Sequence, residues 1–379
     1  MHTNRRSHSP GPVAAGRRDI LKLPLAGGVT AWFGRRPIEA GEERRKVIDE
    51  FDPANIKLAS RVSIRATDED LMFLKQIGLR YIRAEIPSGD AVFKELAGAR
   101  DRFAKAGISL ISSAYYGHQS PNILLGRPGA ERDRDIETCR AAIRELGRNG
   151  VSVLVLDWLP ANTFTTAMVE SARGYRTREF STSDFRSKVE KQQFEREYSA
   201  EEIWAAFAYF LKAVLPVAEE ANVKLCMHPS DPPVEKMMNG VGRIFTDYED
   251  YRRAEQLAGN SRFWGVRLCV GTWAEGGDRM GKDVFEMIRD FGGRGKIFDV
   301  DFRNVSSPLP RFNETFLDDG YLNMYQVMKA LRQARYNGPM VPDHVPGLQG
   351  DPRGVGRAGL AYCIAYMRAL LHAANEEVG

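Results

Sequence analysis

Short apolar runs alternate with longer helical patterns eight times along the chain, and this alternation constrains the fold more than any other feature. The apolar runs predict strands at Ile56–Ser60, Leu79–Ala84, Ile108–Ser112, Val151–Leu156, Val223–Met227, Gly265–Cys269, Ile297–Val300 and Met340–Pro342. The patterns between and after them predict helices at Asp68–Ile77, Phe93–Ala106, Ala130–Asn149, Ala200–Ala221, Thr246–Ala258, Asp283–Phe291, Tyr321–Arg335 and Gly359–Ala374. Repeated strand–helix units with right-handed crossovers predict a closed (β/α)8 barrel.

One long segment interrupts this alternation. It spans Asn162–Ser199, directly after the fourth predicted strand, and its composition predicts a helical and polar insert. Inserts after a barrel strand lie at the carboxyl-terminal rim, where catalytic loops gather. We therefore expect this segment to form a lid or an oligomer contact.

The first 50 residues differ from the remainder, because they are rich in Arg, Gly and Pro without a sustained amphipathic period. We therefore divide the chain into residues 1–50 and a barrel domain at 51–379. Arg17 and Arg18 precede the weakly apolar stretch Leu23–Phe33, an order typical of twin-arginine export signals. This pattern predicts export to the periplasm. A disordered basic arm on a cytoplasmic protein is the alternative, because no clear A-x-A cleavage site follows.

Composition excludes several classes of protein. The chain has 54 basic and 50 acidic side chains, so its formal net charge of +4 gives no argument for nucleic acid or an anionic membrane surface. Four cysteines, widely spaced, indicate free thiols rather than a disulfide framework. No apolar run reaches the roughly 18 residues that a membrane span requires. We expect a small-molecule ligand.

Four successive predicted strands end in residues that bind metals. These residues are His228, Cys269, Asp301 and Asp343. Because the carboxyl ends of barrel strands converge, we expect the four side chains to form one metal site. Taken alone, a histidine at a strand end is more often a hydrogen-bonded structural residue. The oxygen-rich set suits Mn²⁺ or Fe²⁺, while the thiol and imidazole would also accept Zn²⁺.

Further polar residues lie near the same strand ends. Arg267 and Asp299 stand two residues before predicted ligands and therefore point to the same strand face. Arg303, with Asn304 and Glu314 after it, follows the seventh strand and is a candidate clamp for a carboxylate. The alternative for Arg303 is a surface ion pair worth about 0–1 kcal/mol.

Two residues beside the predicted ligands can each be interpreted in two ways. His344 adjoins Asp343 and is a candidate acid or base, or else a group that orients the ligand. Asp231 lies in the Pro-rich turn after His228, where a helix or turn cap is the other interpretation.

Several segments together resemble the mannonate dehydratase family. They are Tyr209–Ala221 leading into Met227–Pro233, Asp301–Val305, Met324 with Val327–Leu331, and Gly338–His344. The resemblance covers about residues 55–375, and the HP-x-DPP turn followed by PDH is its most specific part.

This resemblance implies a xylose-isomerase-like TIM barrel that uses Mn²⁺ or Fe²⁺ to convert D-mannonate to 2-keto-3-deoxy-D-gluconate. By position, the family's metal ligands correspond to the four strand-end residues named above, and a catalytic histidine corresponds to His344. We add Arg303 and Glu314 to the predicted catalytic set. A sugar acid is the expected substrate, and a homo-oligomer is possible.

The chain departs from the family pattern at three positions. Asp301 and Leu317 stand where the family has histidine, and Val345 replaces a glycine. No clear counterpart of the family's catalytic tyrosine follows the PDH motif. A carboxylate at Asp301 adds negative charge and weakens a bound ion as a Lewis acid, unless Arg267 or Arg303 offsets it.

These departures leave two alternatives to mannonate dehydration open. One is a metal-dependent isomerase, epimerase or β-eliminating lyase that acts on another keto sugar. The other is a carbohydrate-binding barrel without catalysis.

Overall fold

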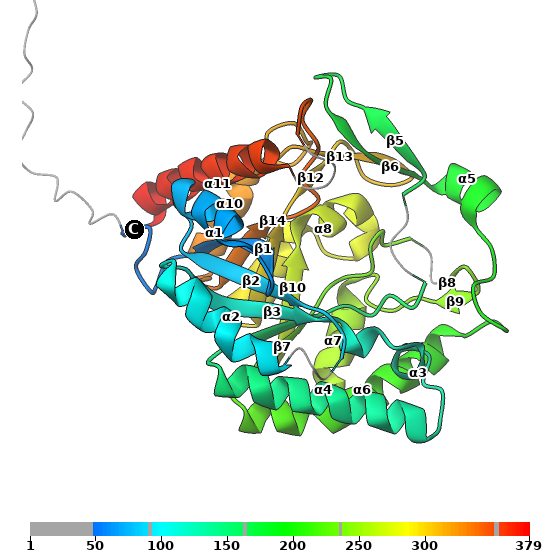
Figure 1. Cartoon of the computed structure of the whole chain (residues 1–379). Coiled ribbons are helices and arrows are strands. Elements are labelled where there is room, and N and C mark those ends of the chain that lie inside the picture. Colours follow the sequence, from blue (N-terminus) through cyan, green and yellow to red (C-terminus); the bar gives the residue numbers. More distant parts are fainter. Residues whose placement is uncertain (1–47, 90–92, 162–164, 235–236, 352–355) are drawn as a thin grey trace, which may run out of the picture. The chain divides into compact units, whose positions relative to one another are not determined.

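Eight parallel strands close into a barrel in the computed structural model of the protein, in the order β1-β14-β11-β10-β7-β4-β3-β2. The structure describes residues 48–89, 93–161, 165–234, 237–351 and 356–379. The barrel strands are β1 (Lys57–Ser63), β2 (Tyr81–Ile86), β3 (Ser109–Tyr115), β4 (Val153–Leu156), β7 (Lys224–Met227), β10 (Trp264–Cys269), β11 (Ile297–Phe302) and β14 (Pro339–Pro342) (Figure 1). All eight predicted strands and the predicted fold class are confirmed.

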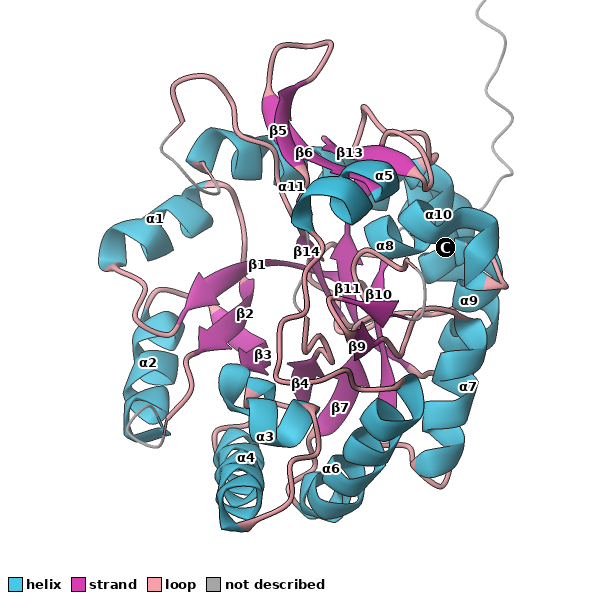
Figure 2. Cartoon of the chain, turned by 90° about the vertical axis from the view of Figure 1, so that its right-hand side faces the viewer, coloured by secondary structure: helices cyan, strands magenta, loops and turns pink. Residues whose placement is uncertain are grey.

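Helices cover the outside of the barrel (Figure 2). They are α1 (Asp68–Gln76), α2 (Phe93–Lys105), α4 (Ala130–Arg148), α6 (Ala200–Glu220), α7 (Tyr248–Leu257), α9 (Val284–Met287), α10 (Met324–Gln333) and α11 (Arg357–Val378). Thr67 and Ser199 begin α1 and α6 with capping boxes, in which the side chain of each cap accepts a hydrogen bond from the third helical residue. The predicted helix Asp283–Phe291 is α9 followed by a π-helical turn, Ile288–Gly292. The short helices α3 (Pro121–Leu124), α5 (Thr182–Asp184) and α8 (Val270–Gly276) were not predicted.

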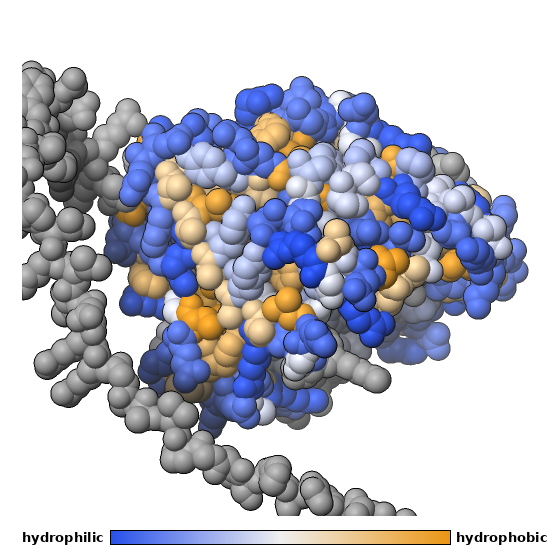
Figure 3. Space-filling view, turned by 90° about the horizontal axis from the view of Figure 1, so that it is seen from above, coloured by the Kyte–Doolittle hydropathy of each residue, from blue (hydrophilic) through white to orange (hydrophobic). Residues whose placement is uncertain are grey.

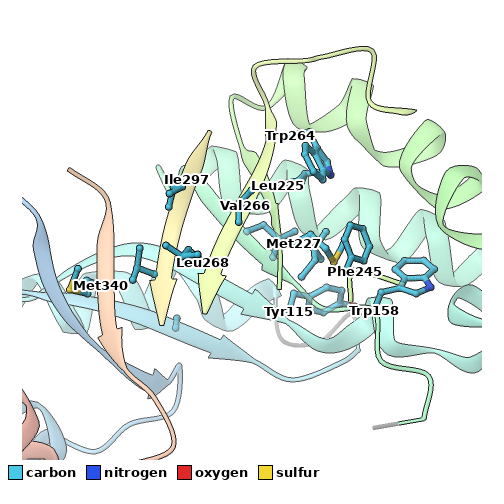
Figure 4. Close-up of a cluster of buried hydrophobic side chains, with 14 of the residues drawn as sticks. Tyr115, Trp158, Leu225, Met227, Phe245, Trp264, Val266, Leu268, Ile297 and Met340 are labelled. Carbon is cyan, nitrogen blue, oxygen red and sulfur yellow. The ribbon is translucent and has the colours of Figure 1, made fainter. Parts of the chain in front are cut away.

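The hydrophobic core has two parts. The larger cluster includes Leu225, Val266 and Leu268 and lies between the strands and the helices (Figure 4). A smaller cluster comes from alternate strand positions and consists of Ala114, Val153, Val155, Cys226 and Phe298. Since successive strand residues point to opposite faces, this second set fills part of the barrel interior. The remaining inward positions near the carboxyl ends are polar, which leaves room there for a site.

The insert after β4 is a β-hairpin, so the prediction of a helical insert is wrong for most of Asn162–Ser199. Strands β5 (Ala167–Glu170) and β6 (Arg176–Ser181) pair antiparallel. They join β13 (Arg311–Thr315) and β12 (Asn304–Val305) in a sheet of order β12-β13-β6-β5. Only α5 and the π-helical turn after it are helical among the insert's described residues.

Tertiary packing explains this error. Phe180 on β6 pairs in register with Phe312 on β13, and their rings stack at 5.7 Å. Both side chains are buried in a small cluster that also holds Phe185. A sheet that assembles from segments more than 100 residues apart, as the Phe180–Phe312 register shows, leaves little local signal for sequence reasoning to use.

The predicted segment 1–50 lies almost entirely outside the described residues, which begin at residue 48. Its predicted export signal therefore stays a prediction. Among the described residues, no helix is both long and apolar enough to span a bilayer.

Candidate active site

A β-bulge in β11 turns two acidic side chains into the barrel. Val266 of β10 pairs with Ile297, but the next residue, Arg267, pairs with Asp299, so β11 has one extra residue at Phe298. A bulge of this kind changes which face the following residues present. Phe298 joins the interior cluster, and Asp299 and Asp301 also face the interior.

Three of the four predicted ligands lie together at the carboxyl ends of neighbouring strands. His228, Cys269 and Asp301 are buried, and their ligand atoms lie within 4.8 Å of one another. We call these three residues the inner cluster. Each comes from a different strand, namely β7, β10 and β11, and a divalent metal ion is the ligand that such a set suits.

The hydrogen bonds of His228 orient its imidazole ring for ligation. Nδ1 lies 2.6 Å from the Pro229 carbonyl oxygen and donates its proton there. Nε2 therefore points toward the inner cluster, 3.4 Å from Asp301 Oδ2, and can bind a metal ion there once it releases its proton. Burial is the largest effect on the ring and opposes protonation. The nearby Cys269 and Asp301 outweigh it and raise the pKa of His228 to about 10.

Cys269 is surrounded by donors that favour the thiolate. Its sulfur accepts from the Thr272 backbone amide at 3.4 Å, from the Thr272 hydroxyl at 3.2 Å and from Arg303 Nη2 at 3.4 Å. Burial opposes ionisation, but Arg303 and His228 lower the pKa of Cys269 below its usual value. The thiolate is the form of cysteine that binds metals.

Asp301 lies between two arginines. Arg267 Nε is 2.7 Å from Oδ2, and Arg83 Nη1 is 2.9 Å from Oδ1. Burial disfavours the charged carboxylate, but Arg267 and Arg83 hold the pKa of Asp301 well below its usual range. Neither carboxylate oxygen has a hydrogen bond of good geometry among the described residues, so both keep acceptor capacity. The extra negative charge of Asp301 is therefore offset by Arg267, one of the two residues considered for that role.

A second buried carboxylate supports this arrangement from within the barrel. Asp299 accepts from Arg83 Nη1 at 2.7 Å and from the Ser112 hydroxyl at 2.5 Å. Arg83 therefore bridges Asp299 and Asp301, and its side chain is only 1% exposed. This bridge fixes the position of Asp301 relative to β2 and β3.

Asp343, the fourth predicted ligand, lies apart from the inner cluster. Its Oδ1 accepts from Arg61 Nη1 at 2.7 Å, and its Oδ2 is 3.8 Å from Arg303 Nε. The group of potential ligand atoms among the described residues does not include it. Burial opposes ionisation, but His344 and Arg61 keep the pKa of Asp343 far below its usual value.

Arg303 is a fully buried hub rather than half of a surface ion pair, so that alternative is wrong. Its guanidinium contacts Glu275 at 2.6 Å, Asp231 at 2.8 Å and Glu314 at 3.2 Å. Asp231 thus pairs with Arg303 inside the site rather than capping a surface turn. Since protein groups occupy both terminal nitrogens and only Nε lacks a hydrogen bond among the described residues, Arg303 orients neighbouring side chains more than it binds a ligand.

His344 lines the inner chamber together with His228 and contacts two carboxylates. Its Nδ1 lies 2.5 Å from Glu314 Oε1, and its Nε2 is 3.7 Å from Asp343 Oδ2. Burial opposes protonation, but Asp343 and Glu314 raise the pKa of His344 above its usual value. The backbone φ of +46° at His344 is in the left-handed region, which is uncommon for a residue other than glycine.

Two adjoining cavities lie beside these residues. The inner chamber, of about 180 Å³, is lined by Arg61, Arg83, Glu85, Ala114, Tyr116, His118, Val155, Asp157, Leu159, His228, Asp231, Arg267, Asp343 and His344. The outer cavity, of about 1260 Å³, lies between β1, α1, the β5–β6 hairpin and the loop after β14. Arg61, Glu85, Asp343 and His344 line both. They therefore lie at the boundary between the two.

Sequence reasoning missed several residues of this site. Arg83 lies inside a predicted strand, and Arg61 directly follows one. An arginine within or next to an apolar run is the sequence signal that could have identified them. Glu275 lies on the unpredicted helix α8, and no pattern in the sequence marks it. Leu317, which stands at a family histidine, is buried and does not line either cavity, whereas Val345 lines the outer cavity.

Comparisons with known proteins point to one family. The family model described as D-mannonate dehydratase (UxuA) matches residues 184–378. A mannonate dehydratase from Streptococcus pneumoniae is 30% identical over 61% of this chain and 68% of its own. Mannonate dehydratase 2 from Halalkalibacterium halodurans is 28% identical over 67% of this chain and 80% of its own.

Solved structures support the same fold. The mannonate dehydratase of Streptococcus suis serotype 2 matches with a TM-score of 0.76 at 25% identity, over 86% of this chain and 96% of that one. An L-ribulose 3-epimerase matches with a TM-score of 0.56 at 14% identity, over 85% and 96% of the two chains, which shows a shared fold alone.

Proposed function

The chain belongs to the mannonate dehydratase family, and from this premise we propose that it removes water from D-mannonate to give 2-keto-3-deoxy-D-gluconate. It is a hydro-lyase that acts on a sugar acid. The observation that carries the specific proposal is the placement of His344, whose pKa is raised by Asp343 and Glu314 in spite of burial, in the chamber that His228 of the buried His–Cys–Asp cluster also lines.

The inner cluster fits a divalent metal ion. The Pro229 carbonyl binds Nδ1 of His228 and leaves Nε2 for the ion, Arg303 and His228 lower the pKa of Cys269 in spite of burial, and Asp301 retains two oxygens without hydrogen bonds. We propose Mn²⁺ or Fe²⁺ as the ion, in keeping with the family; the sulfur and nitrogen ligands would also accept Zn²⁺. When bound, the ion stabilises the negative charge that develops beside the substrate carboxylate.

The protein side chains supply positioning and proton transfer. Arg61 lines both cavities and holds Glu85 and Asp343 at their boundary through hydrogen bonds. Dehydration breaks the C2–H and C3–O bonds: a base of the inner chamber accepts the C2 proton, and His344 Nε2 donates a proton to the departing C3 hydroxyl, since Glu314 holds Nδ1. The enol that remains tautomerises to the 2-keto product. Asp231 and Asp343 have lowered pKa values, in spite of burial, because Arg303 or a histidine lies beside each. Against the effect of burial, Asp343 and Glu314 in turn raise the pKa of His344.

A direct assay tests this function. Protein loaded with Mn²⁺ or Fe²⁺ is incubated with D-mannonate, and the 2-keto-3-deoxy product is measured. The expected result is turnover within the usual enzymatic range of about 1–1000 s⁻¹. The absence of product from protein with about one metal per chain would exclude mannonate as the substrate.

A metal-dependent epimerisation or isomerisation is the second candidate. Leu317 replaces a family histidine and lies outside both cavities, so that position gives no second acid for a leaving hydroxyl. Proton exchange beside a carbonyl needs no such group. Incorporation of solvent deuterium into a keto sugar, without loss of water, would favour this candidate over dehydration.

We also propose that the protein is exported in folded form. The support is the Arg17-Arg18 pair ahead of a weakly apolar stretch. Replacing both arginines with lysine is expected to retain the protein in the cytoplasm. Finding the unaltered full-length protein in the cytoplasm would contradict the proposal.

A further inference from the structure

We propose that Arg178, supported by Arg176, forms a subsite in the outer cavity for a second anionic group of the substrate. The group is a carboxylate or phosphate on the end of the sugar acid remote from the reacting carbons. The inference rests on the proposed hydro-lyase function and extends its substrates from D-mannonate, which has one carboxylate, to sugar acids with two anionic groups.

The outer cavity is larger than a monosaccharide acid needs. Its volume of about 1260 Å³ exceeds the roughly 300–1000 Å³ of ordinary small-molecule sites. It adjoins the inner chamber, and the two share Arg61, Glu85, Asp343 and His344 as lining residues. A substrate whose reacting end lies at this boundary would extend into the outer cavity.

Most charged residues of the outer cavity are already paired. Arg61 pairs with Glu85 at 2.6 Å and with Asp343 at 2.7 Å. Arg357 pairs with Glu69 at 2.6 Å and with Asp70 at 3.1 Å. Asp351 accepts hydrogen bonds from the first amides of α11. These groups have little remaining capacity for a ligand.

Arg176 and Arg178 are the exceptions among the cationic groups. Both are exposed and project from alternate positions of β6, so they share one face of the hairpin. No carboxylate of the described residues lies within 4.0 Å of the Arg176 guanidinium, and for Arg178 the nearest contact is Glu314 Oε2 at 4.0 Å. Across the hairpin, Arg178 faces Met168 and Arg176 faces Glu170. Because Met168 cannot neutralise a guanidinium whereas Glu170 can, Arg178 is better placed than Arg176 to bind an anionic ligand.

Glu314 connects Arg178 to the proposed catalytic acid. One oxygen of Glu314 accepts from His344, and the other faces Arg178. A single side chain, Glu314, therefore lies between the proposed subsite and the proposed catalytic acid. Because β6 pairs with β13, which carries Glu314, the hairpin holds Arg178 at a fixed distance from the site. A guanidinium in this position can hold a carboxylate or phosphate in two parallel hydrogen bonds.

The test compares substrates of different charge. The metal-loaded full chain is assayed with D-mannonate, with the hexaric acid that has a carboxylate at C6, and with 6-phospho-D-mannonate. We expect kcat/KM to be higher for at least one dianion than for mannonate. Arg178→Gln should lower that preference about tenfold, the effect of losing a charged hydrogen bond. Arg178→Lys should retain part of the preference, and the better dianion distinguishes carboxylate from phosphate.

Arg173→Gln is the matched control, since Arg173 lies on the same hairpin but pairs with Asp318 and does not line the cavity. It should leave the preference unchanged. Equal kcat/KM for mannonate and both dianions, or equal loss in Arg178→Gln and Arg173→Gln, would overturn the subsite.

Calorimetric binding of the hexaric acid to the same proteins separates this inference from the proposed function. Binding that Arg178→Gln weakens, without product from any substrate, supports the subsite and contradicts the dehydratase. Product from mannonate, without preference for or added binding of a dianion, does the reverse.

Discussion

The inner cluster and the β5–β6 hairpin use arginine in opposite ways. Around the inner cluster, Arg83, Arg267 and Arg303 are buried and each contacts a carboxylate or thiolate of the protein. On the hairpin, Arg176 and Arg178 are exposed and face a cavity. Buried arginines therefore fix the charge of the reacting centre, while exposed ones remain available to a ligand. The barrel carries the chemistry, and the insert carries selection among substrates.

The surface in Figure 3 agrees with this division. The face seen there is mostly hydrophilic, with apolar residues in scattered small areas. Single exposed apolar residues are ordinary on a soluble protein and mark no interface. On this face, charged groups are the more informative features.

Removing His228 should have the largest effect and abolish the inner cluster. His228→Ala deletes a ligand whose orientation the Pro229 carbonyl fixes. We expect metal content, measured by elemental analysis of protein purified without chelator, to fall from about one ion per chain to a small fraction. Full occupancy in the variant would place the metal elsewhere.

Replacing Arg303 should destabilise the fold strongly. Arg303→Gln leaves buried Glu275 and Asp231 without their cation, and uncompensated buried charges cost about 3–5 kcal/mol. Arg65→Gln is the control, because Arg65 pairs with Glu95 on the surface with 60% of its side chain exposed. Exposed pairs of this kind contribute little to stability, because water screens them. Urea unfolding measures both, and equal losses would show that Arg303 is not the hub described.

Exchanging Asp301 for the family's histidine tests whether Arg83 and Arg267 require a carboxylate at this position. Asp301→His leaves Arg83 and Arg267 beside a neutral ring, so we expect turnover to fall by about 10–100-fold, as when the neighbours of a metal ligand are disturbed. Metal content and steady-state rate are measured together. A rise in turnover at unchanged metal content would mean that the negative charge of Asp301 lowers the rate and that Arg267 does not offset it.

Substitution in the wall of the outer cavity should have the smallest effect. Val345→Gly restores the family residue at a half-buried position that packs against the core. Lost packing and added backbone freedom should lower stability by about 1–2 kcal/mol. We expect kcat/KM for mannonate to change less than threefold. A larger change in kcat/KM would show that the wall of the outer cavity contributes to turnover of mannonate.

The strand ends were predictable from sequence because apolar runs and their terminal residues are local patterns. That is why His228, Cys269 and Asp301 could be named, and they do lie together. The separation of Asp343 was not predictable, since it depends on Arg61, a residue 282 positions away. The hairpin was mistaken for helix for the same reason: its partner strand, β13, lies far along the chain.

The bulge at Phe298 has a further consequence for how a site like this is lost. Phe298 is the extra residue of β11, while Ile297 and Asp299 keep Val266 and Arg267 as their partners. Deletion of Phe298 would therefore give a regular strand in which Asp299 and Asp301 still face the interior. Straightening the strand with Phe298 retained would instead shift the register by one residue and turn both carboxylates toward the helices. The strand would still pair, but metal binding would disappear. One local backbone irregularity therefore separates an enzyme from an inert scaffold of identical composition.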